Sequence, residues 1–177
     1  NAVMRLLPTE VAIDGGRVLF EGKDRASASN AEMRKVRGAG VAMIFQEPMT
    51  ALNPLRTIGD QIGEMFEIHT ELSKKEIKAR VQALLADVRI PDPAQAARAY
   101  PHELSGGQRQ RSMIAMALAL DPRLLIADEP TTALDVTTQA QILKLIKELQ
   151  SRRNTAVLFI THDFGVVAEI ADRVVVM

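Results

Sequence analysis

Three short apolar runs, each followed at once by polar residues, form the clearest pattern in the chain. They occupy residues 41–45, 124–127 and 156–160. Short apolar runs that end in a turn signal are typical of strands buried on both faces of a parallel sheet. We therefore expect these runs to be buried strands of a single sheet.

Helical patterns fill much of the remaining chain. Ser29 with Glu32, and Ser73 with Glu76, have the capping-box spacing that predicts a helix start. Apolar residues at helical spacing mark three further stretches, at residues 77–88, 105–120 and 142–149. Strands and helices alternate after residue 120, which favours a parallel α/β sheet with right-handed crossovers.

The outer parts of the chain are less regular. We interpret residues 1–8 as the last turns of a helix, 11–24 as two strands joined by a turn at Gly15 and Gly16, 49–56 as a loop, and 173–177 as a strand. Both ends look cut, so we expect the chain to be a fragment of a longer domain.

Composition narrows the class of protein. The 177 residues include 22 basic and 22 acidic side chains, so no net field attracts nucleic acid or an anionic membrane. One Tyr, five Phe and no Trp argue against base stacking, and the absence of Cys excludes disulfides and thiolate metal sites. No apolar run is long enough to span a membrane. We expect a globular domain without a nucleic-acid partner.

Polar side chains with chemical capability follow each of the three apolar runs. They are Gln46, the pair Asp128 and Glu129, and His162. The carboxyl ends of parallel strands meet at one edge of a sheet, so these groups are expected to converge there. Together they suit phosphoryl transfer to water, which needs a carboxylate for a metal, a base and donors to phosphate. Taken singly, each could be an ordinary strand-end residue.

A second candidate site is Ser105, Gly106 and Gly107, which precede a predicted helix. Glycines let phosphate oxygens approach backbone N–H groups, and the helix N-terminus favours negative charge. An N-cap serine followed by a flexible loop is the alternative, and the tripeptide alone does not decide between them.

Longer strings carry a resemblance to a known family. Residues 104–111, Leu-Ser-Gly-Gly-Gln-Arg-Gln-Arg, resemble the signature motif of ATP-binding cassette (ABC) ATPases. Four more of that family's motifs have counterparts, in the same order: the Q-loop at 45–48, the Walker B strand at 124–130, the D-loop at 132–135 and the switch histidine at 160–163. Residues 49–54 and 100–103 resemble the oligopeptide, dipeptide and nickel importer branch.

The resemblance implies a role for each strand-end residue. Asp128 would bind Mg²⁺, and Glu129 would act as the general base on the attacking water. Gln46 would sense Mg²⁺ and the γ-phosphate of ATP and link the site to membrane subunits. His162 would contact the γ-phosphate.

The resemblance also implies a second cassette. Ser105, Gly106, Gly107 and Gln108 would bind, in trans, an ATP held by that cassette, and Asp135 would cross the same interface. ATP would thus join two cassettes, and hydrolysis would release them.

The fold implied is α/β: a P-loop NTPase-like, mainly parallel sheet with an antiparallel β portion and an inserted helical subdomain. The chain would be one partial ABC ATPase domain, with residues 1–56 and 120–177 as the core and 57–119 as the helical subdomain. Its expected function is to energise an importer of peptides or similar small solutes from the cytoplasmic face of the cell membrane. Its partners would be permease subunits and, indirectly, a solute-binding protein.

One family motif is absent. The sequence contains no phosphate-binding G-x-x-x-x-G-K-[ST] loop, because Gly22 and Lys23 lack both the earlier glycine and the following hydroxyl residue. We expect this loop upstream of Asn1. By itself the chain is expected to be inactive and to keep only the trans half of an ATP site.

Two other functions remain to be weighed. Soluble ABC ATPases of DNA repair or translation often carry coiled coil or zinc-binding cysteines between Q-loop and signature, whereas this chain has a compact, cysteine-free helical stretch there. A catalytically incompetent cassette serving only as an interaction domain could dispense with the active carboxylate, yet Glu129 and His162 are both present. The transporter ATPase is therefore the favoured prediction.

Overall fold

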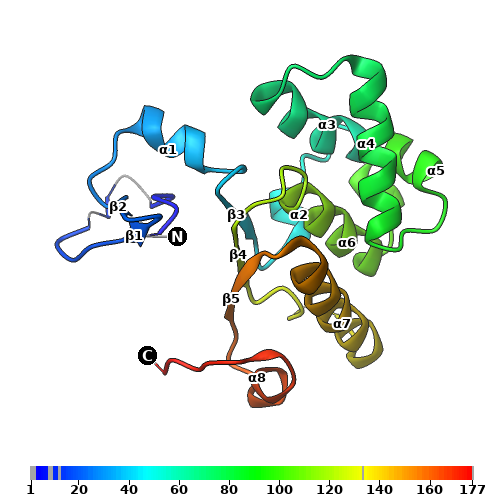
Figure 1. The fold of residues 1–177 in the computed structure, drawn as a ribbon. Coiled ribbons are helices and arrows are strands. Elements are labelled where there is room, and N and C mark those ends of the chain that lie inside the picture. The colour runs from blue at the N-terminus through cyan, green and yellow to red at the C-terminus, as the bar shows by residue number, and fades with distance from the viewer. Residues whose placement is uncertain (1–2, 8–9, 12, 133, 177) are drawn as a thin grey trace.

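A three-stranded parallel sheet lies at the centre of the molecule (Figure 1). The computed structural model describes residues 3–7, 10–11, 13–132 and 134–176, with residue 49 described by its backbone alone. The strands are β3 (Val41–Ile44), β4 (Leu124–Asp128) and β5 (Ala156–Ile160), paired in that order. The predicted parallel α/β sheet is confirmed.

The two faces of the sheet enter different apolar clusters, as the alternation of side chains along a strand requires. Ala42, Ile44 and Ala127 pack into the main core with the helices. Val41, Met43 and Ile126 face the other way and pack with Met4 and Phe20 in the N-terminal part. Burial of all four residues of β3 agrees with the sequence pattern.

The expectation that residues 156–160 are buried on both faces is wrong. β5 lies at one end of the described sheet and pairs only with β4. Ala156 is exposed, and the Leu158 side chain has 46% of its surface exposed. An apolar run shows that a strand belongs in a sheet but not that described elements cover both of its faces.

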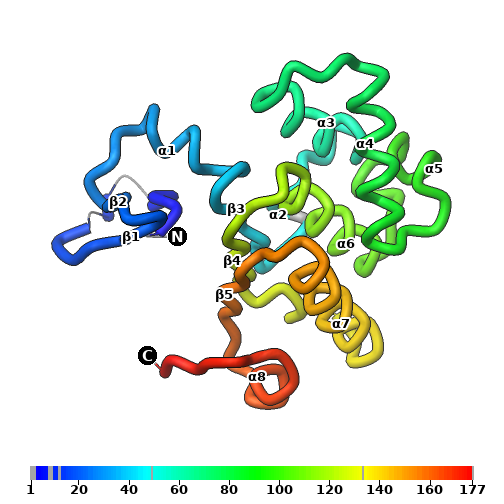
Figure 2. The backbone as a smooth tube through the Cα atoms, viewed as in Figure 1, coloured from blue at the N-terminus to red at the C-terminus, as the bar shows by residue number. Residues whose placement is uncertain are grey.

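Helices cover one side of the sheet, and a group of further helices packs beyond them (Figures 1 and 2). Each of the four long helices begins after a residue whose side-chain oxygen accepts a backbone N–H of the first turn, namely Thr57, Ser73, Ser105 or Asp135. The helices on this side are α3 (Ile58–His69), α4 (Lys74–Asp87), α5 (Pro93–Arg98), α6 (Gly106–Ala117) and α7 (Val136–Arg153). The second capping box, Ser73 with Glu76, is confirmed.

The remaining elements confirm some predictions and correct others. Capping box Ser29–Glu32 opens α1 (Asn30–Val36), as expected. The antiparallel pair β1 (Leu19–Phe20) and β2 (Lys23–Asp24) turns at Glu21 and Gly22 rather than at Gly15 and Gly16. Glu21 and Gly22 both have positive φ, 52° and 73°, which a tight hairpin turn requires.

Three terminal or connecting segments also differ from expectation. A short helix, α2 (Pro48–Ala51), forms where a loop was predicted, because Pro48 suits the first helical turn. Residues 3–5 form a turn rather than helix, and residues 1, 2 and 8 lie outside the described part. After α8 (Phe164–Ile170), residues 173–176 form no strand, and residue 177 lies outside the described part. A 3₁₀ turn, η1 (Pro101–Glu103), precedes α6.

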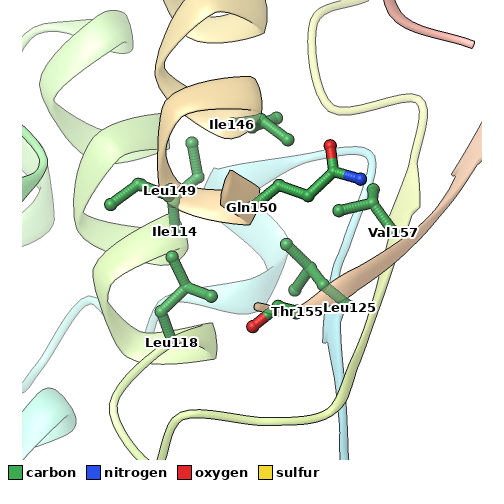
Figure 3. A pocket seen from close by; sticks show the side chains of 8 residues that line it. All are labelled: Ile114, Leu118, Leu125, Ile146, Leu149, Gln150, Thr155 and Val157. Carbon is green, nitrogen blue, oxygen red and sulfur yellow. The ribbon is translucent and has the colours of Figure 1, made fainter. Parts of the chain in front are cut away.

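The core behind the sheet is closely packed. A cavity of about 10 Å³ remains between α6, β4, α7 and β5, lined mainly by aliphatic side chains (Figure 3). Thr155 at its edge is buried, and its hydroxyl donates a hydrogen bond to the Pro122 carbonyl at 2.9 Å. The ends of β4 and β5 therefore lie next to a closely packed core.

Candidate functional site

Glu129 leaves β4 in an unusual backbone conformation. Its φ is 44°, in the left-handed region, and Pro130 follows. The Glu129 N–H still donates to the Ile160 carbonyl at 3.0 Å, so its backbone stays attached to the end of β5. Six other described residues that are not glycine also have positive φ, so this conformation marks a sharp turn and not by itself a functional site. The turn places the carboxyl group at the edge of the sheet.

Three side chains contact the Glu129 carboxylate. His162 Nδ1, beyond β5, lies 2.8 Å from Oε1. Gln46 Nε2, beyond β3, donates to Oε2 at 3.0 Å. The Thr132 hydroxyl, from the same turn, donates to Oε2 at 2.9 Å. The structure therefore brings together Gln46, Glu129 and His162, the three strand-end residues that the sequence placed at one edge.

These contacts shift the pKa values of the pair in opposite directions. Hydrogen bonds from His162 and then Thr132 lower the pKa of Glu129, which favours its ionised form. The same hydrogen bond and the negative charge of Glu129 raise the pKa of His162. Because an ionised carboxylate can only accept hydrogen bonds, His162 carries a hydrogen on Nδ1. Its side chain is 74% exposed and its other ring nitrogen is available to a ligand.

Asp128 precedes Glu129 and fits the requirements of a metal ligand. Its side chain is only partly exposed and makes no hydrogen bond or ion pair with the described residues. No group of three or more acidic or histidine side chains in the described part could enclose a metal by itself. A single carboxylate such as Asp128 can be enough for Mg²⁺, which usually binds one or two carboxylates together with water and substrate phosphates. The side-chain oxygen of Gln46 is a second candidate ligand, because only the nitrogen of that amide group is hydrogen-bonded to Glu129.

The signature residues lie at the start of α6. Ser105 and Gln108 form a reciprocal capping box: the Gln108 side chain accepts the Ser105 N–H at 2.9 Å, and the Ser105 hydroxyl accepts the Gln108 N–H at 3.3 Å. Gly106 is exposed, and a Cβ there would meet nothing within 4 Å. A Cβ on Gly107 would lie 3.0 Å from Thr138 Cγ2, so α6 begins against the first turn of α7.

Asp135 caps that first turn of α7. Its carboxylate accepts the Thr138 N–H at 3.0 Å and the Thr138 hydroxyl at 2.6 Å. The hydroxyl bond, and then the backbone bond, lowers the pKa of Asp135. Ser105, Gln108 and Asp135 therefore make local capping contacts here, separate from the Glu129 cluster. A cavity of about 140 Å³ lies between the two groups, with Gln46, Gly106 and Pro130 in its lining.

Thr132 is the site residue that sequence reasoning did not single out. In the sequence it is only the first residue of the string that resembles the D-loop. Its contact follows from the left-handed turn at Glu129, which brings a side chain three residues downstream back to the carboxylate. The only signal in the sequence was a hydroxyl residue shortly after an Asp-Glu-Pro string.

Comparison with known proteins decides the family. The model of the family described as ABC transporter matches residues 2–132, well over half of the chain. The chain belongs to the ABC transporter family.

Its relatives include several peptide transport proteins of bacteria. The chain is 55% identical to the dipeptide transport ATP-binding protein DppD of Bacillus subtilis, over all of this chain and 53% of the relative. It is 56% identical to the probable peptide ABC transporter ATP-binding protein y4tR of Sinorhizobium fredii, over 99% of this chain and 53% of the relative. The chain therefore spans about half the length of the curated relatives it matches.

Solved structures agree with this assignment. A dimeric ATP-binding cassette in a post-hydrolysis state, bound to ADP and Pi, superposes with a TM-score of 0.78 at 29% identity. The match covers 90% of this chain and 68% of that one. Within the described residues, no helix is both long and apolar enough to cross a membrane.

Proposed function

We propose that the full-length protein is the ATP-hydrolysing subunit of an importer for peptides or similar small solutes. The observation that carries this proposal is the Glu129 carboxylate, held at the end of β4 by Gln46 and His162 from the two neighbouring strand ends. An ionised carboxylate, an amide and an exposed imidazole at one point are the groups needed to transfer a phosphoryl group to water. The names of the peptide transport relatives support the substrate class.

In the proposed reaction, a water molecule attacks the γ-phosphorus of ATP while Glu129 takes one of its protons. The water O–H bond breaks, and a new O–P bond forms. The bond from the γ-phosphorus to the bridging oxygen breaks, and its electron pair leaves with ADP. Phosphate is the second product, and Glu129 returns its proton to solvent. Glu129 can accept this proton because it is ionised at neutral pH, and the hydrogen bonds that lower its pKa favour that ionised form while making it a weaker base.

Gln46 and His162 orient the reacting groups. His162 donates from Nδ1 to Glu129, which leaves its second ring nitrogen to face the γ-phosphate. Gln46 lies between β3 and α2, and its side-chain amide is hydrogen-bonded to Glu129. A movement of this segment would therefore change the position of that amide at the site. Asp128, with the Gln46 carbonyl, would hold Mg²⁺, which when bound neutralises phosphate charge.

The trans half of the site belongs to the same proposal. Ser105, Gly106, Gly107 and Gln108 bind the ATP of a second cassette, and Asp135 lies at the same interface. Exposure of Ser105, Gly106 and Asp135 and the open space at Gly106 support this assignment. The dimeric state of the similar cassette supports a cassette dimer.

The remaining partners follow from the importer role. The cassettes act peripherally at the cytoplasmic face of the cell membrane, on permease subunits that receive solute from a solute-binding protein. Residues 1–56 and 120–177 form the nucleotide-facing core, and 57–119 form a helical subdomain that contacts the permease. The packing of α3, α4 and α5 against one another supports this division.

Reconstitution tests the proposal directly. The full-length protein, assembled with its permease in vesicles, should hydrolyse ATP and accumulate a labelled dipeptide only when ATP is present. A matched preparation without the permease measures the basal rate. If the assembled complex shows no ATP turnover, the enzyme assignment is wrong. ATP turnover without peptide uptake would contradict only the substrate class.

A further inference from the structure

We propose that Thr132 is a positioning residue for Glu129, which fixes Oε2 of the carboxylate and leaves Oε1 to accept the proton of the attacking water. This inference rests on the proposed function of Glu129 and adds a residue to it. It comes from the distribution of three hydrogen bonds over the two carboxylate oxygens.

An ionised carboxylate has about four acceptor positions, two on each oxygen. Oε2 uses both of its positions, for Gln46 Nε2 at 3.0 Å and the Thr132 hydroxyl at 2.9 Å. Oε1 uses one, for His162 Nδ1 at 2.8 Å. The position that remains open is on Oε1, so water meets the carboxylate at that oxygen.

The three partners differ in how firmly they are tied to Glu129. Gln46 and His162 come from other strand ends, 83 and 33 residues away along the chain, and both are exposed. Thr132 belongs to the turn that Glu129 begins, and its own N–H donates to the Glu129 carbonyl at 3.3 Å. It therefore holds Oε2 from within the same turn, whereas Gln46 and His162 reach the carboxylate from other strand ends.

The backbone turn at Glu129 brings the Thr132 hydroxyl within reach of the carboxylate. With φ at 44°, Glu129 lies outside the usual helical and extended regions, and its side chain leaves the sheet edge with 22% of its surface exposed. A short, rigid hydroxyl residue on the same turn restricts the rotation of this carboxylate without blocking the water side. Thr132 itself is exposed and supports no part of the apolar core.

Steady-state ATP hydrolysis by the full-length protein tests the assignment. Thr132→Val removes the hydroxyl and keeps the shape, and Thr132→Ser restores the hydroxyl. We expect Thr132→Val to lower kcat by about 10- to 100-fold, the factor typical for loss of a hydrogen bond to a charged group, with KM for ATP unchanged. Thr132→Ser should recover most of the rate. Thr132→Ala is the second hydroxyl-free variant, used if valine impairs folding at this turn.

A double-mutant cycle separates positioning from a merely structural role. If Thr132 acts through Glu129, Thr132→Val should cost nothing further in a Glu129→Gln background. A wild-type kcat in Thr132→Val, or an equal loss in both backgrounds, would overturn the assignment. Wild-type turnover in Glu129→Gln alone would instead contradict the proposed function, so the two failures are distinguishable.

Discussion

His162 Nδ1 lies 2.8 Å from Glu129 Oε1, although the two residues follow different strands. The contact exists because β4 and β5 are parallel neighbours, with Asp128 opposite Ile160 in the register. Each residue extends just beyond its strand, and the two side chains meet at the sheet edge. In this pair His162 donates the hydrogen on Nδ1, and the ionised Glu129 carboxylate accepts it.

This pairing predicts a raised pKa for His162. The hydrogen bond to Glu129 and the negative charge of Glu129 favour the imidazolium, so His162 should titrate above the ordinary histidine value of about 6.5. NMR titration of the nucleotide-free full-length protein measures this, with the signal assigned by its loss in His162→Gln. The pKa should fall when Glu129 is replaced by Gln. An unchanged pKa in that variant would contradict the pairing.

The raised pKa of His162 also makes the stability of the fold depend on pH. A group with a raised folded-state pKa stabilises the fold fully below its unfolded pKa, and this contribution is lost as pH rises through the folded value. The stabilisation from His162 should therefore be complete below about pH 6.5 and decline above it. Urea unfolding at several pH values should show this slope in the wild type and lose it in His162→Gln.

Arg153 should be important for stability. Its side chain is 15% exposed, lies 2.7 Å from Asp87 at the end of α4, and also contacts Asp121 and the Leu118 carbonyl. Asp87 is 37% exposed and keeps a second ion pair with Arg152, so Arg153→Met should cost about 1–3 kcal/mol in the free energy of unfolding, through the lost hydrogen bonds to charged groups. Arg152→Met is the matched control: its side chain is 57% exposed, and its loss should cost less than about 1 kcal/mol. Equal costs would refute this role.

Thr155 should show the energetic value of one buried hydrogen bond. Thr155→Val keeps the shape but leaves the Pro122 carbonyl without its hydroxyl donor. We expect a loss of about 1–3 kcal/mol by urea denaturation, while Thr155→Ser, which keeps the donor, should lose less. A valine variant as stable as the wild type would show that the hydroxyl adds nothing to this core.

Gly59 and Gly63 form a matched pair on α3. A Cβ at Gly59 would lie 2.6 Å from the Ala97 backbone oxygen, whereas one at Gly63 would meet the Ile77 side chain at 3.3 Å. Alanine gains about 1 kcal/mol of helix propensity at either position. Gly59→Ala should nevertheless be destabilising by about 1–3 kcal/mol, because backbone must move, and clearly less stable than Gly63→Ala. Thermal unfolding ranks the two, and the reverse order would contradict the close packing of α3 and α5.

Sequence reasoning predicted the convergence of Gln46, Glu129 and His162 because parallel strands share the direction in which they end. It did not predict the contact of Thr132, since that depends on the left-handed φ of Glu129 and not on any periodicity. It also misjudged β5, because strand order decides whether Leu158 is covered. The hairpin was misplaced because Gly15 and Gly16 give as strong a local turn signal as Gly22, where the structure turns.

ATP hydrolysis by the full-length Glu129→Gln variant tests the central claim, that Glu129 is the base of an ATP-hydrolysing site. Glutamine keeps the shape of the side chain but cannot take a proton from water. Glu67→Gln, an exposed position on α3, controls for the charge change. We predict that Glu129→Gln binds ATP and hydrolyses it about 10²–10⁴-fold more slowly, while Glu67→Gln matches the wild type. Wild-type turnover in Glu129→Gln would remove Glu129 from this role.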